Sequence, residues 1–462
     1  MQSTLAPAPK SSLLGKLSAA TVFAYILVIL YGDYNLNQSN FIIRILFTPA
    51  FFMLAGAMLM QPGRLKQWDI RFLCLYVLWI AVDTLIISRV SMYRYEDTVY
   101  YVAAFALGCY PMASLLPKEE RGRTFRGMFH VFIAVITALC ILGLVVVLMQ
   151  TQLETARGQL TGIPAAGEGD QRLYIIGMHG NFYAPIICIM LMMSIYMILS
   201  YKHMAIRIYY VIVALILYIT LPLSDSRTNM VAVAVGLGLL AMLLVLWRVK
   251  WKPSVFGAIV AVVCAGVVAV GAYGGYGLVM RGIESVAVKS AVAEEAAGSE
   301  VQLTESRDLL KDLATATGRT RIWKETFKTV QEKPIILLTG LTNHHTYEAI
   351  PSYPQYDGRL HNSFIQVLIA FGLPALILVV CFLVVLAKRC IPLFFKPGLN
   401  VSLADRFLPV VLACCLVISM FESFFFLESP GMYSPLFYLV AGYVMVTMGE
   451  AKNAGALPLD PA

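Results

Sequence analysis

Apolar residues in this sequence fall into long runs separated by shorter polar segments. Twelve runs approach the length of about 20 residues that a helix needs to cross a bilayer. They cover residues 17–32, 40–60, 70–88, 98–116, 127–149, 182–200, 207–223, 228–248, 254–277, 362–387, 407–426 and 430–448. This pattern predicts an all-α, polytopic membrane protein with about 12 transmembrane helices.

Two polar segments are longer than the others and divide the predicted helices into groups. Residues 1–277 hold the first nine helices and include a medium loop at 150–181. A large loop at 278–361 follows, and its patterning predicts helices rather than a linker. The last three helices occupy residues 362–449, and a tail at 450–462 ends the sequence.

Composition and charge support a membrane protein and give its orientation. Charged residues make up only 13% of the chain, whereas a soluble protein carries about 25%. With the N-terminus inside, 19 Lys and Arg lie on the inner side, against 5 in the short and medium outer loops. The positive-inside rule therefore predicts cytoplasmic termini, with both longer loops outside or in the periplasm. The net charge of +8 fits anchoring to anionic lipid headgroups and is poor evidence for nucleic-acid binding.

Three polar positions are predicted to share the outer membrane face. Arg227 follows a very short loop and begins a predicted helix that Asp225 or Ser226 can cap. A cation there opposes both the helix dipole and the positive-inside bias, which favours an anion site over a membrane anchor. His361 directly precedes another predicted helix, for which Asn362 or Ser363 is a plausible cap. A histidine at this boundary is either a proton-transfer group or an ordinary interfacial residue.

The third position lies on a helix expected within the large loop, at about residues 318–331. Trp323, Phe327 and Val330 recur at helical spacing and predict an apolar stripe, with Arg319 on the same face. The alternative is a helix that lies against the membrane or the helix bundle while Arg319 snorkels. Weaker candidates at the outer face lie just before a predicted helix or between two predicted helices. They are Arg172, His179, Asn181, Glu422 and Glu428.

Several kinds of chemistry find no support in the sequence. There is no P-loop, GxGxxG or HExxH motif, and His344–His345 has no third metal ligand at convincing spacing. We therefore expect no metal and no cofactor. The predicted spans hold few ionisable residues, Arg44, Asp83 and His130 being the clearest, which disfavours an ion-coupled transporter.

Taken together, these motifs resemble a known family. The pattern is Ser224-x-Ser226-Arg227, then Gly318-Arg319-x-x-x-Trp323, then His361-Asn362 followed by Gly372. Over about residues 180–390 it is similar to the O-antigen ligase/polymerase superfamily, and the length and layout most resemble the O-antigen ligases.

This resemblance implies a fold and a reaction. Such enzymes are similar to membrane glycosyltransferases of the GT-C type and work without a metal. They transfer a glycan from undecaprenyl pyrophosphate to an acceptor in the periplasmic leaflet of the inner membrane, which for a ligase is a sugar hydroxyl of lipid A–core.

The resemblance also suggests a role for each candidate residue. His361 is the expected general base of an inverting transfer, and Arg227 and Arg319 are expected to hold the pyrophosphate, with Arg172 and Arg321 as weaker candidates. The expected supporting residues are Ser224, Ser226, Asn362, His179, Asn181 and Trp323.

Three other functions stay open at this point. An O-antigen polymerase uses the same donor but a lipid-linked glycan as acceptor. A protein O-oligosaccharyltransferase transfers to Ser or Thr, and many have a longer C-terminal soluble region than this sequence shows. A lipid-linked glycan transporter would carry out no chemistry and would not need a histidine at the membrane boundary.

Overall fold

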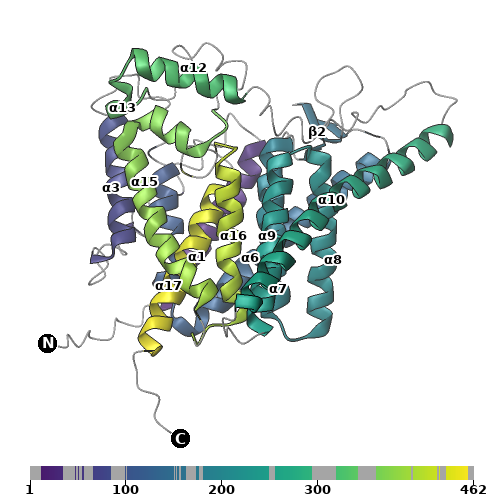
Figure 1. Cartoon of the computed structure of the whole chain (residues 1–462), viewed down its shortest axis with the longest axis horizontal. Coiled ribbons are helices and arrows are strands. Elements are labelled where there is room, and N and C mark those ends of the chain that lie inside the picture. The colour runs from purple at the N-terminus through teal and green to yellow at the C-terminus, as the bar shows by residue number, and fades with distance from the viewer. Residues whose placement is uncertain are drawn as a thin grey trace, which may run out of the picture.

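Helices make up nearly all of the computed structural model (Figure 1). It describes residues 12–34, 47, 50, 55–56, 66–84, 99, 101–149, 151, 153–155, 158–162, 173–175, 180–248, 255–293, 319–341, 360–396, 399–423, 426 and 433–455. The long helices are α1 (Ser12–Tyr34), α3 (Trp68–Val82), α6 (Lys118–Leu148), α7 (Gly180–Ser200), α8 (Met204–Thr220), α9 (Arg227–Arg248), α10 (Val255–Ala293), α15 (Ser363–Phe395), α16 (Leu403–Ser419) and α17 (Tyr433–Gly455). Shorter helical segments are the π-helix η3 (Ala104–Cys109), α5 (Met112–Leu115), the 3-10 helix η4 (Leu221–Ser224), α12 (Arg319–Glu332) and α13 (Ile336–Thr339).

Described helical residues lie in all twelve segments predicted from the apolar pattern. In segment 40–60, which falls mostly outside the described residues, they are Phe47, Ala50, Ala55 and Gly56. The helix α10 continues to Ala293, beyond the apolar run that ends near residue 277, and its part long and apolar enough to cross a membrane is Gly257–Val279. The residues that follow are rich in Ala and Val and contain no proline, so the helix outlasts its apolar part. The start of the predicted large loop is therefore helical.

Six helices in the described part of the chain are long and apolar enough to cross a membrane. They are α6, α7, α8 extended through η4, α9, the Gly257–Val279 part of α10, and α15. Of the most apolar stretch of α7, 78% is buried, whereas for α10 the share is 6%. In water, the exposed apolar face of α10 would be unfavourable, but in a bilayer lipid covers it. The chain is thus a helical membrane protein with α7 at its centre and α10 at its edge.

A small antiparallel sheet departs from the all-α expectation. Its strands are β1 (Leu153–Thr155), β2 (Gly158–Gly162) and β3 (Tyr174–Ile175), in the order β1-β2-β3. The sheet lies within the predicted medium loop, between α6 and α7. The buried Leu173 next to β3 donates its N–H to the carbonyl of Leu223 in η4 at 3.0 Å. This bond links the sheet to the turn that precedes α9.

The helices α12 and α13 pack at one end of the bundle, above α15 (Figure 1). α15 is interrupted at Gly372, whose φ of 78° and ψ of 178° suit glycine almost alone. Gly340, which follows α13, has a φ of 69°, and a Cβ there would meet the Ala370 carbonyl oxygen at 2.3 Å. The Leu341 N–H donates to the Ile369 carbonyl across the same contact. The two glycines thus let α13 dock directly onto the first, N-terminal part of α15.

The predicted loop helix is present as α12, but its buried face differs from the predicted stripe. Ile322 and Val330 are buried, whereas Phe327 is 46% exposed. Ile322 of α12 joins a small apolar cluster with Ile336, Leu360 and Ile369. This cluster packs α12 and α13 against the N-terminal part of α15. Part of the buried face is shifted by one position, from Trp323 to Ile322, because Ile322 is the residue that packs against α13 and α15.

Candidate active site

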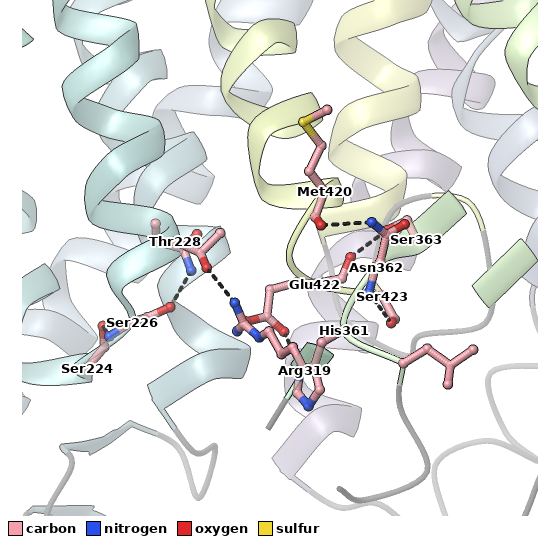
Figure 2. Close-up of polar contacts among 12 residues, drawn as sticks. Ser224, Ser226, Thr228, Arg319, His361, Asn362, Ser363, Met420, Glu422 and Ser423 are labelled. Carbon is pink, nitrogen blue, oxygen red and sulfur yellow. Dashed lines mark hydrogen bonds and ion pairs between the residues drawn. The ribbon is translucent and has the colours of Figure 1, made fainter. Parts of the chain in front are cut away.

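Glu422 joins two of the predicted site residues. One carboxylate oxygen accepts a hydrogen bond from Arg319 Nη2 at 2.9 Å, and the other lies 3.1 Å from His361 Nδ1 (Figure 2). Its side chain is only 2% exposed. A carboxylate buried this far is unfavourable unless it is paired, and charged hydrogen bonds of about 1.5–3 kcal/mol each offset that cost. Arg319, Glu422 and His361 therefore form one connected cluster, which we call the site triad.

The turn that carries Glu422 is bonded to the start of α15. Asn362 donates from its side chain to the Met420 carbonyl at 2.9 Å and from its backbone to Ser423 Oγ at 3.1 Å. Ser363 Oγ donates to the carbonyl of Glu422 at 2.6 Å. These bonds hold the C-terminal end of α16 against the N-terminal end of α15, so that Glu422 and His361 keep a fixed distance (Figure 2).

Asn362 is the N-cap of α15. Its side-chain oxygen accepts from the N–H groups of Phe364 and Ile365 at 2.9 and 3.0 Å. Of the two caps that the sequence allowed, Asn362 and Ser363, the first provides the cap, and Ser363 binds the Glu422 turn instead. Capping fixes the direction in which the preceding residue, His361, leaves the helix.

His361 adopts a left-handed backbone conformation with a φ of 49°. Such a conformation is uncommon for a residue other than glycine and is typically found where the surroundings impose it. With Glu422 ionised, Nδ1 carries the proton and donates to it, which places the basic lone pair of a neutral imidazole on Nε2. The side chain is 18% exposed, so a substrate hydroxyl can reach it.

Arg319 connects the site triad to α9. Besides contacting Glu422, its Nη1 lies 3.4 Å from Thr228 Oγ1 in the first turn of α9 (Figure 2). A guanidinium has five N–H donors, so these two contacts do not use its full capacity. Since Arg319 begins α12, Arg227 begins α9 and Ser363 begins α15, three helix N-termini converge here. The positive ends of the helix dipoles favour an anion at such a place.

Arg227 sits directly before Thr228, at the edge of this site. Its Nε lies 4.0 Å from Asp225 Oδ1, and its side chain is 24% exposed. Asp225 has a φ of 47° and follows η4. The predicted cap residue Ser226 precedes α9, but its hydroxyl accepts from the Asn229 side chain at 2.7 Å. Ser224 also serves the turn, since its hydroxyl donates to Leu221 and accepts from the Ser226 N–H.

The remaining predicted residues have different positions. Arg321 is 69% exposed and pairs with Glu325 one turn along α12, at 2.9 Å, so it lies away from the site triad. Trp323 Nε1 donates to the carbonyl of Leu360, the residue before His361, and thereby supports the histidine. Asn181 lies in the first turn of α7, beside Gly180, where a Cβ would meet the Ser224 carbonyl oxygen at 2.3 Å.

Arg172, His179 and Gly318 lie outside the described residues, as does Glu428. Their predicted roles therefore stay predictions. Within the described part of the chain, no group of three His, Cys, Asp or Glu side chains has the arrangement of a metal site.

From the sequence, Glu422 was only one of the weaker candidates at the outer face. In the structure it contacts both Arg319 and His361. Thr228 and Gln366, whose side-chain oxygen accepts from the Leu360 N–H at 3.0 Å, were not predicted at all. The signal that could have found Glu422 is its position directly after an apolar helix. A carboxylate close to the bilayer is unfavourable and is typically kept for function.

The fold and the site define a helical membrane protein with a cluster of Arg, Glu and His at one end of its bundle. Residues 211–380 match the model of a family described as O-antigen ligase. This match confirms the resemblance to the O-antigen ligase superfamily, and it indicates a glycosyltransferase-like ligase or polymerase. The matched segment contains Arg227, Arg319 and His361, while Glu422 lies beyond it. A search of curated proteins found no match.

Proposed function

We propose that the protein is an O-antigen ligase, which transfers O-antigen polysaccharide from undecaprenyl pyrophosphate to a sugar hydroxyl of lipid A–core. The observation that carries this proposal is the contact of one buried carboxylate, Glu422, with both Arg319 and His361. It joins a group able to bind phosphate to a group able to accept a proton. A transporter would need no such pairing.

His361 is the proposed general base. Its Nε2 takes the proton of the acceptor hydroxyl as that oxygen forms a bond to the anomeric carbon of the donor. Glu422 holds the imidazole by Nδ1 and stabilises the positive charge that develops on the ring. Direct attack without a covalent enzyme intermediate inverts the configuration at that carbon. Such base catalysis is typically worth about 10²–10⁴ in rate.

Arg319 and Arg227 are proposed to receive the leaving group. The bond between the anomeric carbon and the phosphate oxygen breaks, and its electron pair stays on the undecaprenyl pyrophosphate. Arginine binds phosphate oxygens with two parallel donors, and the three helix N-termini add favourable dipoles. Glu422 and Asp225 already balance part of the positive charge of Arg319 and Arg227. The helix dipoles therefore add to the binding of the doubly charged pyrophosphate of the donor.

We also propose a location and a fold type for this chemistry. The site faces the periplasm from the inner membrane, both termini are cytoplasmic, and the architecture is of the GT-C type with about 12 spans. The donor and the acceptor are both lipids, so they reach the site sideways through the bilayer. The glycosyl pyrophosphate supplies the free energy, and no nucleotide is needed.

The test supplies purified protein with lipid-linked O-antigen and lipid A–core and measures the joined product. We expect joining by the wild type and by His203→Ala, which changes an exposed histidine at the opposite end of α7. His361→Ala should fold normally but lose at least about 100-fold in rate. Polymer growth without lipid A–core would identify a polymerase, transfer to a peptide would identify a protein transferase, and lipid movement without a new bond would identify a transporter.

Metal dependence is a separate test of this mechanism. Since guanidinium groups are proposed to hold the pyrophosphate, the rate should be unchanged after EDTA treatment. A loss of activity in EDTA that a divalent ion restores would contradict the metal-free mechanism while leaving the ligase assignment intact.

A further inference from the structure

A large cavity lies at the end of the bundle opposite to the site triad. Its volume is about 1000 Å³, at the upper end of the range for ligand pockets. The start of α3, the C-terminal half of α15 and the C-terminal half of α17 line it. His361 precedes the first residue of α15, whereas the cavity borders that helix from Val380 to Arg389, so the two places are separated by most of its length.

The charged residues of this cavity are mostly cations. Lys66, Lys388 and Arg389 line it, and none of them pairs with a carboxylate in the described part of the chain. The two carboxylates in its wall are already bound. Asp69 accepts from Tyr110 Oη at 2.5 Å, and Glu450 pairs with Arg121 at the same distance. The cavity therefore presents a surplus of positive charge.

On the N-terminal side of Lys388, the α15 wall of the cavity is apolar. Val380, Val384 and Lys388 follow one another at intervals of four residues, so they lie along one face of α15. Val380 is 43% exposed and Val384 is 47% exposed. Across the cavity, Trp68 at the start of α3 is 59% exposed and stacks on Phe72, as aromatic residues do at a membrane interface.

We propose that this cavity binds an anionic phospholipid. The headgroup phosphate contacts Lys388, Arg389 and Lys66, and an acyl chain lies along Val384 and Val380. A free anion would use the cations but would gain nothing from the apolar face. A zwitterionic lipid would use the apolar face but would leave the positive charge unbalanced. The bound lipid would connect α3, α15 and α17, whose residues line the cavity.

The experiment measures binding of phosphatidylglycerol to the purified full-length protein by native mass spectrometry. Lys388→Gln together with Arg389→Gln should weaken binding by about tenfold or more, since each charge near an anionic headgroup contributes about fivefold. The matched control is Lys202→Gln with Arg207→Gln, which removes the same charge at the same end of the bundle but outside the cavity. The control should bind like the wild type.

A second variant tests the apolar part, which the charge variants do not address. Val384→Trp fills the path of the acyl chain and should also lower phosphatidylglycerol binding, without changing the charge. Phosphatidylcholine should bind at least tenfold more weakly than phosphatidylglycerol, and 10 mM inorganic phosphate should not compete. Equal losses in the control pair, equal binding of both lipids, competition by inorganic phosphate, or unchanged binding by Val384→Trp would each overturn the proposal.

Discussion

Glu422 determines the geometry of the site at the level of single residues. It follows α16, receives Arg319 from α12 and lies against His361 at the start of α15. Because the carboxylate is buried, it restricts both partners to one arrangement. Removing it would leave two donors without their acceptor and would free the imidazole to rotate. We therefore regard Glu422 as a positioning residue for the proposed base.

The two arginines at the start of α12 offer a matched pair for a prediction. Arg319→Lys should lower transfer by about 100-fold, because a single ammonium group cannot replace a guanidinium that spans Thr228, Glu422 and a phosphate. Arg321→Lys should stay within a factor of about two, since this residue is 69% exposed and pairs with Glu325 one turn along the helix. Initial rates of product formation measure both. Equal rates for the two variants would remove Arg319 from the mechanism.

Among the helices and turns, the contact between α13 and α15 supports the site. Trp323 of α12 donates a hydrogen bond to Leu360, and the close backbone approaches at Gly340 and at Gly372 hold α13 on the first part of α15. These contacts fix the position of α12, which carries Arg319, relative to His361 at the start of α15. A shift of α13 would move Arg319 and His361 relative to each other.

The glycines provide a test of this support. Gly372→Ala and Gly340→Ala should each lower the Tm of the purified protein by about 4 °C or more, because both positions have positive φ and no room for a Cβ. Gly266→Ala on α10 is the control, since its Cβ would meet nothing within 4 Å. Thermal unfolding followed by intrinsic fluorescence gives the Tm values. A Tm for Gly372→Ala equal to that of the control would contradict the docking role.

The helices were more predictable from the sequence than the contacts between them. Apolar runs locate α7, α9 and α15, and Asn362 marks a helix start because its side chain can cap locally. Glu422 and Arg319 are 103 residues apart, so their contact depends on how α16, α12 and α15 pack. The stripe of α12 was misplaced for a similar reason, since its buried face depends on how α12 packs against α13 and the start of α15.

At the scale of the whole molecule, the two ends of the bundle differ in their chemistry. α12 and β2 lie at one end (Figure 1). Arg319 of α12 brings the site triad to that end, whereas the cavity borders the C-terminal half of α15, at the other end. The excess of Lys and Arg among the loops at the second end predicts that it faces the cytoplasm.

Labelling with a membrane-impermeant maleimide tests this orientation. Lys328→Cys, on the exposed face of α12, should react in spheroplasts, because we place this end in the periplasm. Lys202→Cys, between α7 and α8, should react only after lysis. The unsubstituted protein is the control, since its described cysteines are buried or half-buried. The reverse labelling pattern would place the site triad on the cytoplasmic side.

The central claim is that His361 and Glu422 act together, and a double-mutant cycle on the transfer rate tests it most directly. Glu422→Gln keeps the shape of the side chain but removes its charge, and Glu332→Gln is an exposed control on α12. We expect Glu422→Gln to lower the rate by about 10²-fold, His361→Ala by at least as much, and the double variant by no more than His361→Ala alone. Losses that multiply, or near-normal transfer by His361→Ala, would contradict the account.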